Sequence, residues 1–72
     1  MKIKNKIKIT VNGKQMQVMP KFSIKTLIKK LKIPLNKIAV ELNNKIIDKK
    51  RISKIYLQNG DKIEIVHFIG GG

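Results

Sequence analysis

The chain has 72 residues, 42% of them hydrophobic and 29% charged, which suits one small globular domain with little room for a buried catalytic pocket. It has no cysteine and a single histidine, so disulfides, thiolate metal sites and a thiol nucleophile are excluded, and a Ser-His triad is implausible. Asp61 and Glu64, two of the four carboxylate side chains, lie at an odd spacing that puts them on opposite faces of a strand. We therefore expect a carrier or binding module with no catalytic residues, no metal and no bound cofactor.

The formal net charge of +13 at pH 7 would attract nucleic acid, anionic membranes or acidic proteins. Lys, Ile and Asn are abundant together, and A/T-rich codons encode all three, so compositional drift explains the charge better than selection for nucleic acid. Arg51 is the one arginine, although arginine is the preferred bidentate partner of phosphate. No apolar run reaches the length of a membrane span. We expect neither nucleic acid nor membrane as a partner, and a cytoplasmic protein, or a stromal one if the gene is plastid-encoded.

The N-terminal part of the chain predicts a β-hairpin. Apolar Ile3, Ile7, Ile9 and Val11 alternate with polar residues, mostly lysine, which is the period of a strand with one buried face. Asn12-Gly13 follows, and this pair is the strongest short signal for a hairpin turn because both residues tolerate positive φ. Apolar residues then alternate with glutamine up to Val18, as expected of the returning strand.

A helix is predicted after the hairpin. Ser23 can cap its N-terminus, and Pro34 stops it. Between them the apolar residues recur at the spacing of one helical stripe, at Ile24, Leu27, Ile28 and Leu31.

The second half of the chain predicts three more strands, at 38–42, 46–47 and 62–69. Turns precede the last two, at Asn43-Asn44 and at Asn59-Gly60-Asp61. Residues 48–58 between them are irregular or form a short helical turn, with core candidates at Ile52, Ile55 and Leu57. One helix can cover one face of a mixed sheet of four or five strands, so we predict an α+β fold of the β-grasp, or ubiquitin-like, type.

The chain ends in three glycines, Gly70, Gly71 and Gly72. Glycine loses the most backbone freedom on folding, so we expect a single domain over residues 1–69 and a flexible tail over 70–72. Without β-carbons such a tail can thread a narrow channel of another protein, and its terminal carboxylate is ionised at neutral pH. Taken alone, this motif fits a frayed chain end equally well.

Residues 59–72, NGDKIEIVHFIGGG, closely resemble the C-terminal signature of the ThiS family of thiamine-biosynthesis sulfur carriers. Residues 11–14, the helix and residues 39–43 also fit this family at the right spacings. Two features depart from it: the chain is more basic than is common in the family, and residues 48–51 replace a motif that often contains Pro-Arg.

The resemblance implies a route for sulfur through Gly72. An E1-like adenylating enzyme, ThiF, would use ATP-Mg to adenylate the Gly72 carboxylate. A cysteine desulfurase would supply the sulfur that converts it to a thiocarboxylate, and thiazole synthase, ThiG, would take that sulfur into the thiazole ring.

The last predicted strand also suggests a docking surface for these partners. Its isoleucines fall on one face, so Val66 and Phe68 should form an apolar patch on the open face of the sheet, beside the tail. We expect Val66, Phe68 and Ile69 to dock partners, unless neighbouring side chains bury them. His67 should lie on the inner face as a structural histidine.

Four alternatives remain. A molybdopterin-synthase sulfur carrier shares the fold, but Val66–Ile69 stands where that family has prolines. Sulfur carriers for tRNA thiolation and ubiquitin-like modifiers share the tail chemistry and stay open. A basic RNA-binding module related to the TGS domain would explain the charge. However, Phe22, Tyr56 and Phe68 are too few aromatics for a base-stacking platform.

Overall fold

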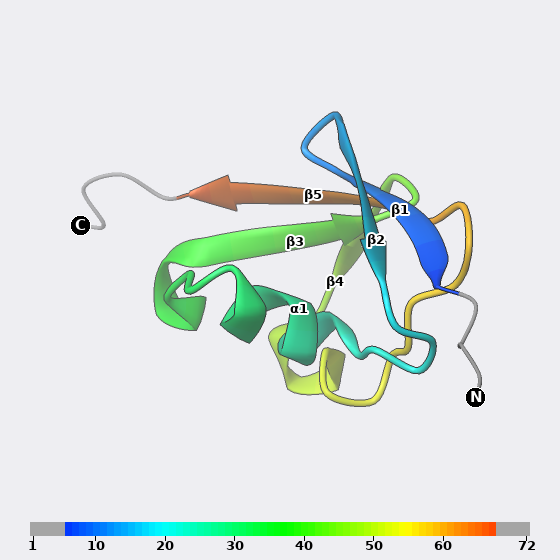
Figure 1. The fold of residues 1–72 in the computed structure, drawn as a ribbon. Coiled ribbons are helices and arrows are strands. Elements are labelled where there is room, and N and C mark those ends of the chain that lie inside the picture. The colour runs from blue at the N-terminus through cyan, green and yellow to red at the C-terminus, as the bar shows by residue number, and fades with distance from the viewer. Residues whose placement is uncertain (1–5, 68–72) are drawn as a thin grey trace.

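Five strands form one mixed sheet, and one helix packs on one of its faces (Figure 1). The computed structural model describes residues 6–67. The sheet order is β2-β1-β5-β3-β4, with β1 parallel to β5 and the other neighbouring pairs antiparallel. The strands are β1 (Ile7–Val11), β2 (Lys14–Val18), β3 (Ile38–Leu42), β4 (Lys45–Ile47) and β5 (Lys62–His67). This arrangement confirms the predicted β-grasp fold.

The hairpin of β1 and β2 forms as its sequence predicts. Asn12 and Gly13 take φ values of 50° and 84°, which a two-residue hairpin turn of the favoured hand requires. Ile9 and Val18 are buried, whereas the lysines and glutamines of both strands are exposed. The predicted start of the first strand, at Ile3, lies outside the described residues.

The helix α1 (Ile24–Lys30) is capped by Ser23, whose Oγ accepts a hydrogen bond from the Thr26 N–H at 3.1 Å. Three residues of the predicted apolar stripe are completely buried, and Leu31 packs partly buried at the C-cap. The helix ends before Pro34 is reached, because Lys32 turns the chain at a φ of 60°. A 3-10 turn, η1 (Leu35–Lys37), then leads into β3.

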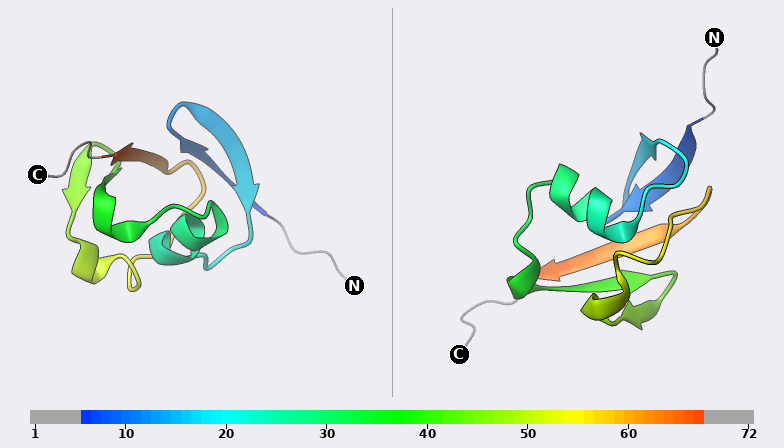
Figure 2. Two further views of the ribbon diagram at one scale, coloured as in Figure 1. Left: turned by 90° about the vertical axis from the view of Figure 1, so that its left-hand side faces the viewer. Right: turned by 90° about the horizontal axis from the view of Figure 1, so that it is seen from below.

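Residues 48–58 close the core beneath the helix (Figure 2). They contain a second 3-10 turn, η2 (Lys49–Arg51), and bring Ile52 and Leu57 into the core at 2% and 3% exposure. Backbone hydrogen bonds fix this segment to the start of the helix: the Ile24 N–H donates to the Ile55 carbonyl, and the Leu57 N–H to the Phe22 carbonyl. The predicted core residues in this irregular segment are therefore confirmed, with Ile55 only partly buried.

Within residues 6–67, no helix has both the length and the apolar character that crossing a bilayer requires.

Candidate functional site

The strand that leads to the C-terminal glycines, β5, lies in the middle of the sheet (Figure 1). It pairs with β1 on one side and with β3 on the other, and Ile63 and Ile65 are 0% and 5% exposed. A central strand with a buried face cannot slip by one residue without turning its apolar side chains to solvent. The position of β5 in the sheet is therefore fixed, and the C-terminal residues extend from this fixed strand. The predicted site residues Phe68, Ile69, Gly70, Gly71 and Gly72 lie outside the described residues.

A hydrogen-bonded network holds the beginning of β5. The Asp61 carboxylate accepts from the Gln58 N–H at 2.8 Å and from the Asn43 side-chain amide at 3.0 Å. The Asn43 side-chain oxygen accepts from the Lys62 N–H at 2.9 Å, and the Asn43 N–H donates to the Lys62 carbonyl at 2.8 Å. The turn between β3 and β4 is thus tied to the turn that precedes β5. These hydrogen bonds set the register of β5 against β3.

Asn12, at the hairpin turn, holds the far half of β5. Backbone pairing with β1 ends at Ile63, where the Asn12 N–H donates to the Ile63 carbonyl at 2.9 Å. The Asn12 side chain then takes the place of the next strand residue. Its Oδ1 accepts from the Ile65 N–H at 2.7 Å, and its Nδ2 donates to the Ile65 carbonyl at 3.2 Å. The Asn12 side chain therefore provides the hydrogen-bond partner of Ile65 in β5, beyond the point where β1 ends.

The face of the sheet away from α1 carries a small mixed patch at its β5-β3-β4 end. The register places Ala39 opposite Val66, and Glu41 opposite both Glu64 and Ile46. Directly opposed residues lie on the same face, so these five residues share one surface, which we call the open sheet face. Val66 is 49% exposed and Ile46 is 77% exposed, while Ala39 and the two glutamates are half-buried. Glu41 and Glu64, two of the four carboxylate side chains of a strongly basic chain, thus lie beside exposed apolar side chains.

The predicted exposure of Val66 on the open sheet face is confirmed. Ile46 was not predicted as part of this surface, although it is the most exposed of the large apolar residues described. The signal was present in the sequence: in a two-isoleucine strand, successive side chains point to opposite faces, so one of Ile46 and Ile47 had to face outwards.

The expectation for His67 is confirmed for the face on which it lies, but not for its role as a structural histidine. Its register partner is the fully buried Ile38, so His67 does belong to the inner face of the sheet. The His67 side chain is nevertheless exposed. The reason is its position as the last residue of β5, at the end of the sheet, so it does not act as a buried structural histidine.

Other kinds of site find little support in residues 6–67. No group of three or more His, Asp or Glu side chains in this part of the chain could hold a metal ion. Among the surface hollows of these residues, one is lined by Lys8, Gln15, Met16 and Gln17 and another by Lys21 and Tyr56. Neither set contains a carboxylate or an imidazole that could act as a general base near neutral pH.

Comparison with known proteins is consistent with this geometry. A model of the ThiS family matches residues 7–72. The crystal structure of a thiamine biosynthesis protein, ThiS, from Geobacter metallireducens superposes with a TM-score of 0.81 at 29% identity, covering 92% of this chain and all of that one. The sulfur carrier protein ThiS of Bacillus subtilis is 55% identical over 38 residues, which are 51% of this chain and 58% of that protein.

A thiazole synthase of Paramagnetospirillum magneticum is also similar, at 35% identity over 66 residues. The match includes 92% of this chain, but the chain spans only 20% of that synthase. The family match over nearly the whole sequence and the shared fold agree with each other and with the glycine ending. The chain belongs to the ThiS family, a family of small sulfur carrier proteins rather than catalysts.

Proposed function

We propose that this chain carries sulfur for the thiazole ring of thiamine as a thiocarboxylate on Gly72. The observation that carries the proposal is the family match, which extends through the terminal glycines. The similarity to a segment of a thiazole synthase adds to it, because a carrier-like segment within a synthase suggests that the two act together. Thiazole synthase, ThiG, is therefore the proposed acceptor.

The proposed reaction first activates the Gly72 carboxylate, which is a poor electrophile, and then replaces one of its oxygens by sulfur. In the active site of an adenylating enzyme such as ThiF, a Gly72 carboxylate oxygen attacks the α-phosphorus of ATP-Mg and pyrophosphate leaves, which gives an acyl-adenylate. A persulfide sulfur from a cysteine desulfurase attacks the acyl carbon and AMP leaves. A thiol reductant then cleaves the resulting acyl disulfide and releases the thiocarboxylate. The desulfurase needs a reduced cysteine thiol to receive the sulfur, and thiols stay reduced in compartments such as the cytoplasm or the plastid stroma.

The proposed role of the folded body of the chain is to present the tail to its partner enzymes. Three features hold β5 in place: its central position in the sheet, the network at Asp61 and the two side-chain hydrogen bonds between Asn12 and Ile65. A partner that grips the body therefore meets the end of β5, from which the tail extends, at a defined position. We propose that the open sheet face is the surface that the adenylating enzyme grips. Its exposed Val66 and Ile46 suit an apolar anchor, and Glu41 and Glu64 suit basic side chains around that anchor.

Transfer of labelled sulfur tests the proposal. The full chain is incubated with the adenylating enzyme, ATP-Mg, desulfurase and isotopically labelled cysteine, and is then passed to thiazole synthase. We expect the label in the thiazole product, and none when the chain lacks Gly72 but keeps its circular dichroism spectrum. Labelled thiazole from the chain without Gly72 would exclude the terminal carboxylate as the carrier group.

A further inference from the structure

The positive charge of the protein is concentrated on one side. Residues 21–37 and 48–54, which contain α1, η1 and η2, together form what we call the helical side. Ten of its fifteen exposed residues are lysine or arginine, and Asp48 is its one carboxylate. In the rest of residues 6–67, five of twenty exposed residues are cationic. The ten cations are Lys21, Lys25, Lys29, Lys30, Lys32, Lys37, Lys49, Lys50, Arg51 and Lys54.

This distribution bears on the origin of the charge. Compositional drift, which the sequence alone favours, raises lysine wherever a side chain is exposed and therefore predicts similar frequencies on all sides. The observed frequency on the helical side is more than twice that elsewhere in the described part. Drift supplies lysine, but it does not account for where the lysines lie.

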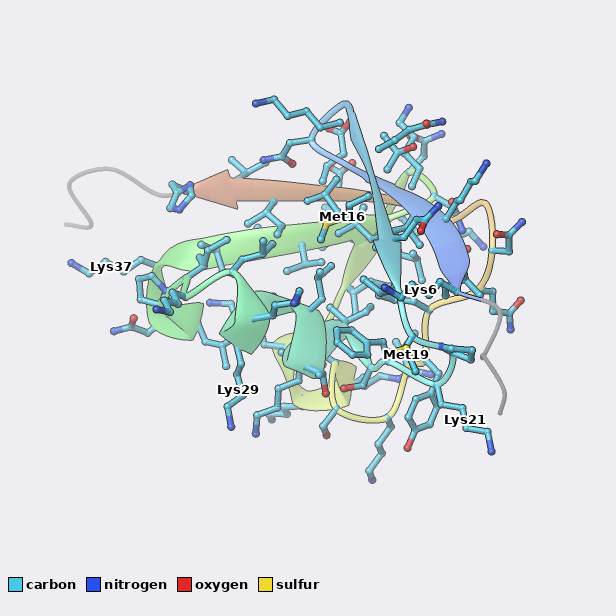
Figure 3. The ribbon with its side chains drawn as sticks, viewed as in Figure 1. Lys6, Met16, Met19, Lys21, Lys29 and Lys37 are labelled. Carbon is cyan, nitrogen blue, oxygen red and sulfur yellow. The ribbon has the colours of Figure 1, made fainter. Side chains whose placement is uncertain are left out.

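The two segments of the helical side form one continuous surface. The Lys25 N–H donates to the Ile52 carbonyl at 3.1 Å, and Lys49 Nζ donates to the Leu35 carbonyl at 2.9 Å. Figure 3 shows Lys21 and Lys29 extending away from the sheet on this side of the molecule. Cations that are far apart in the sequence therefore share one layer.

The apolar side chains decide which polyanion this surface fits. Ile24, Leu27, Ile28 and Ile52 are buried, and no large apolar side chain within residues 21–37 and 48–54 is exposed. The exposed Tyr56 borders this surface, where it lines a hollow with Lys21. Protein interfaces need an apolar centre and are depleted in lysine, and stable membrane attachment needs apolar anchors. Neither is provided here. Phosphate binding needs only cations, because its driving force is the release of condensed counterions.

We propose that the helical side binds the sugar–phosphate backbone of a nucleic acid without reading its sequence. Lysine contacts phosphate as a point charge and carries no base specificity in doing so. Glu41 and Glu64 on the open sheet face repel phosphate, so the bound chain presents its sheet to solvent. This surface is separate from the carrier role and does not depend on it.

Two variants with the same loss of charge test the proposal. The first is Lys25→Gln/Lys29→Gln/Lys50→Gln/Arg51→Gln, on the helical side. The second removes four exposed lysines elsewhere, as Lys8→Gln/Lys14→Gln/Lys45→Gln/Lys62→Gln. The binding of a short fluorescent RNA duplex, and of the DNA duplex of the same sequence, is measured by anisotropy across a salt series, with circular dichroism as the folding check.

We expect the first variant to bind at least about tenfold more weakly and to lose about three to four units of salt slope, while the second stays within about threefold of the parent. Equal weakening by both variants would overturn the proposal, because net charge and not the helical side would then determine the affinity. Failure of the parent chain to bind either duplex would overturn the proposal, and so would binding to anionic vesicles or to a poly-glutamate peptide in preference to the duplexes. Sulfur transfer through Gly72 is assayed separately, so either idea can fail alone.

Discussion

The two sides of this small protein are built differently. The open sheet face mixes exposed Val66 and Ile46 with two opposed glutamates, whereas two thirds of the exposed residues on the helical side are lysine or arginine and its core residues, such as Ile24 and Leu27, are buried. The first surface has the ingredients of a protein interface and the second has those of a phosphate-binding surface. Overall charge, +13 in the whole chain, hides this difference. The position of each charge, and not its sum, indicates which partner each side suits.

The largest effect is expected where the sheet meets the core. Ile63 is completely buried in β5, so Ile63→Asp places a carboxylate in the core and should cost more than about 4 kcal/mol, enough to unfold a domain of this size. Ile46→Asp, at 77% exposure, should change the free energy of unfolding by less than about 0.5 kcal/mol. Urea denaturation measures both. A similar loss of unfolding free energy in the two variants would mean that Ile46 is buried, and therefore that the open sheet face is covered.

The next effect separates docking from folding. Val66→Asp should weaken binding to the adenylating enzyme by about tenfold or more, because a charge replaces a proposed apolar anchor. Met19→Asp is the matched control, since Met19 is similarly exposed, at 42% against 49%, but is not part of the open sheet face. Calorimetric titration gives both affinities. Equal binding by the two variants would remove Val66 from the interface.

A smaller effect tests the clamp on β5. Asn12→Gly keeps the positive φ of the turn and removes both hydrogen bonds to Ile65, so unfolding should become easier by about 1–2 kcal/mol. Asn44→Gly changes another turn residue at positive φ, 73°, and should be nearly neutral. Hydrogen exchange at the Ile65 amide should rise only in the first variant. Unchanged protection there would show that the Asn12 side chain does not secure the strand.

Local signals made much of the fold predictable. Asn12-Gly13 specifies its own turn, Ser23 caps its own helix, and the period of the apolar residues separates strand from helix. Contacts between distant segments were not predictable in this way. The two hydrogen bonds between Asn12 and Ile65 join residues 53 positions apart, and they form only when β5 inserts beside β1.

The open sheet face and the helical side were likewise only partly predictable from the sequence. Alternation along β5 predicted the exposure of Val66, because period alone assigns a face. It could not predict that His67 is exposed on the inner face, since that depends on where the sheet ends. Nor could it predict the charge of the helical side, which exists because η2 folds beside α1 and adds its cations to those of the helix.

Gly72 is the proposed acceptor of the sulfur, and intact-mass spectrometry with fragment-ion mapping can show whether sulfur is added there. After treatment with the adenylating enzyme, ATP-Mg, desulfurase and cysteine, one oxygen of the C-terminal residue should be replaced by sulfur. The sulfur carrier protein ThiS of Bacillus subtilis is treated in parallel as the reference. An unchanged mass while that protein is converted, or sulfur on any residue other than Gly72, would contradict the account.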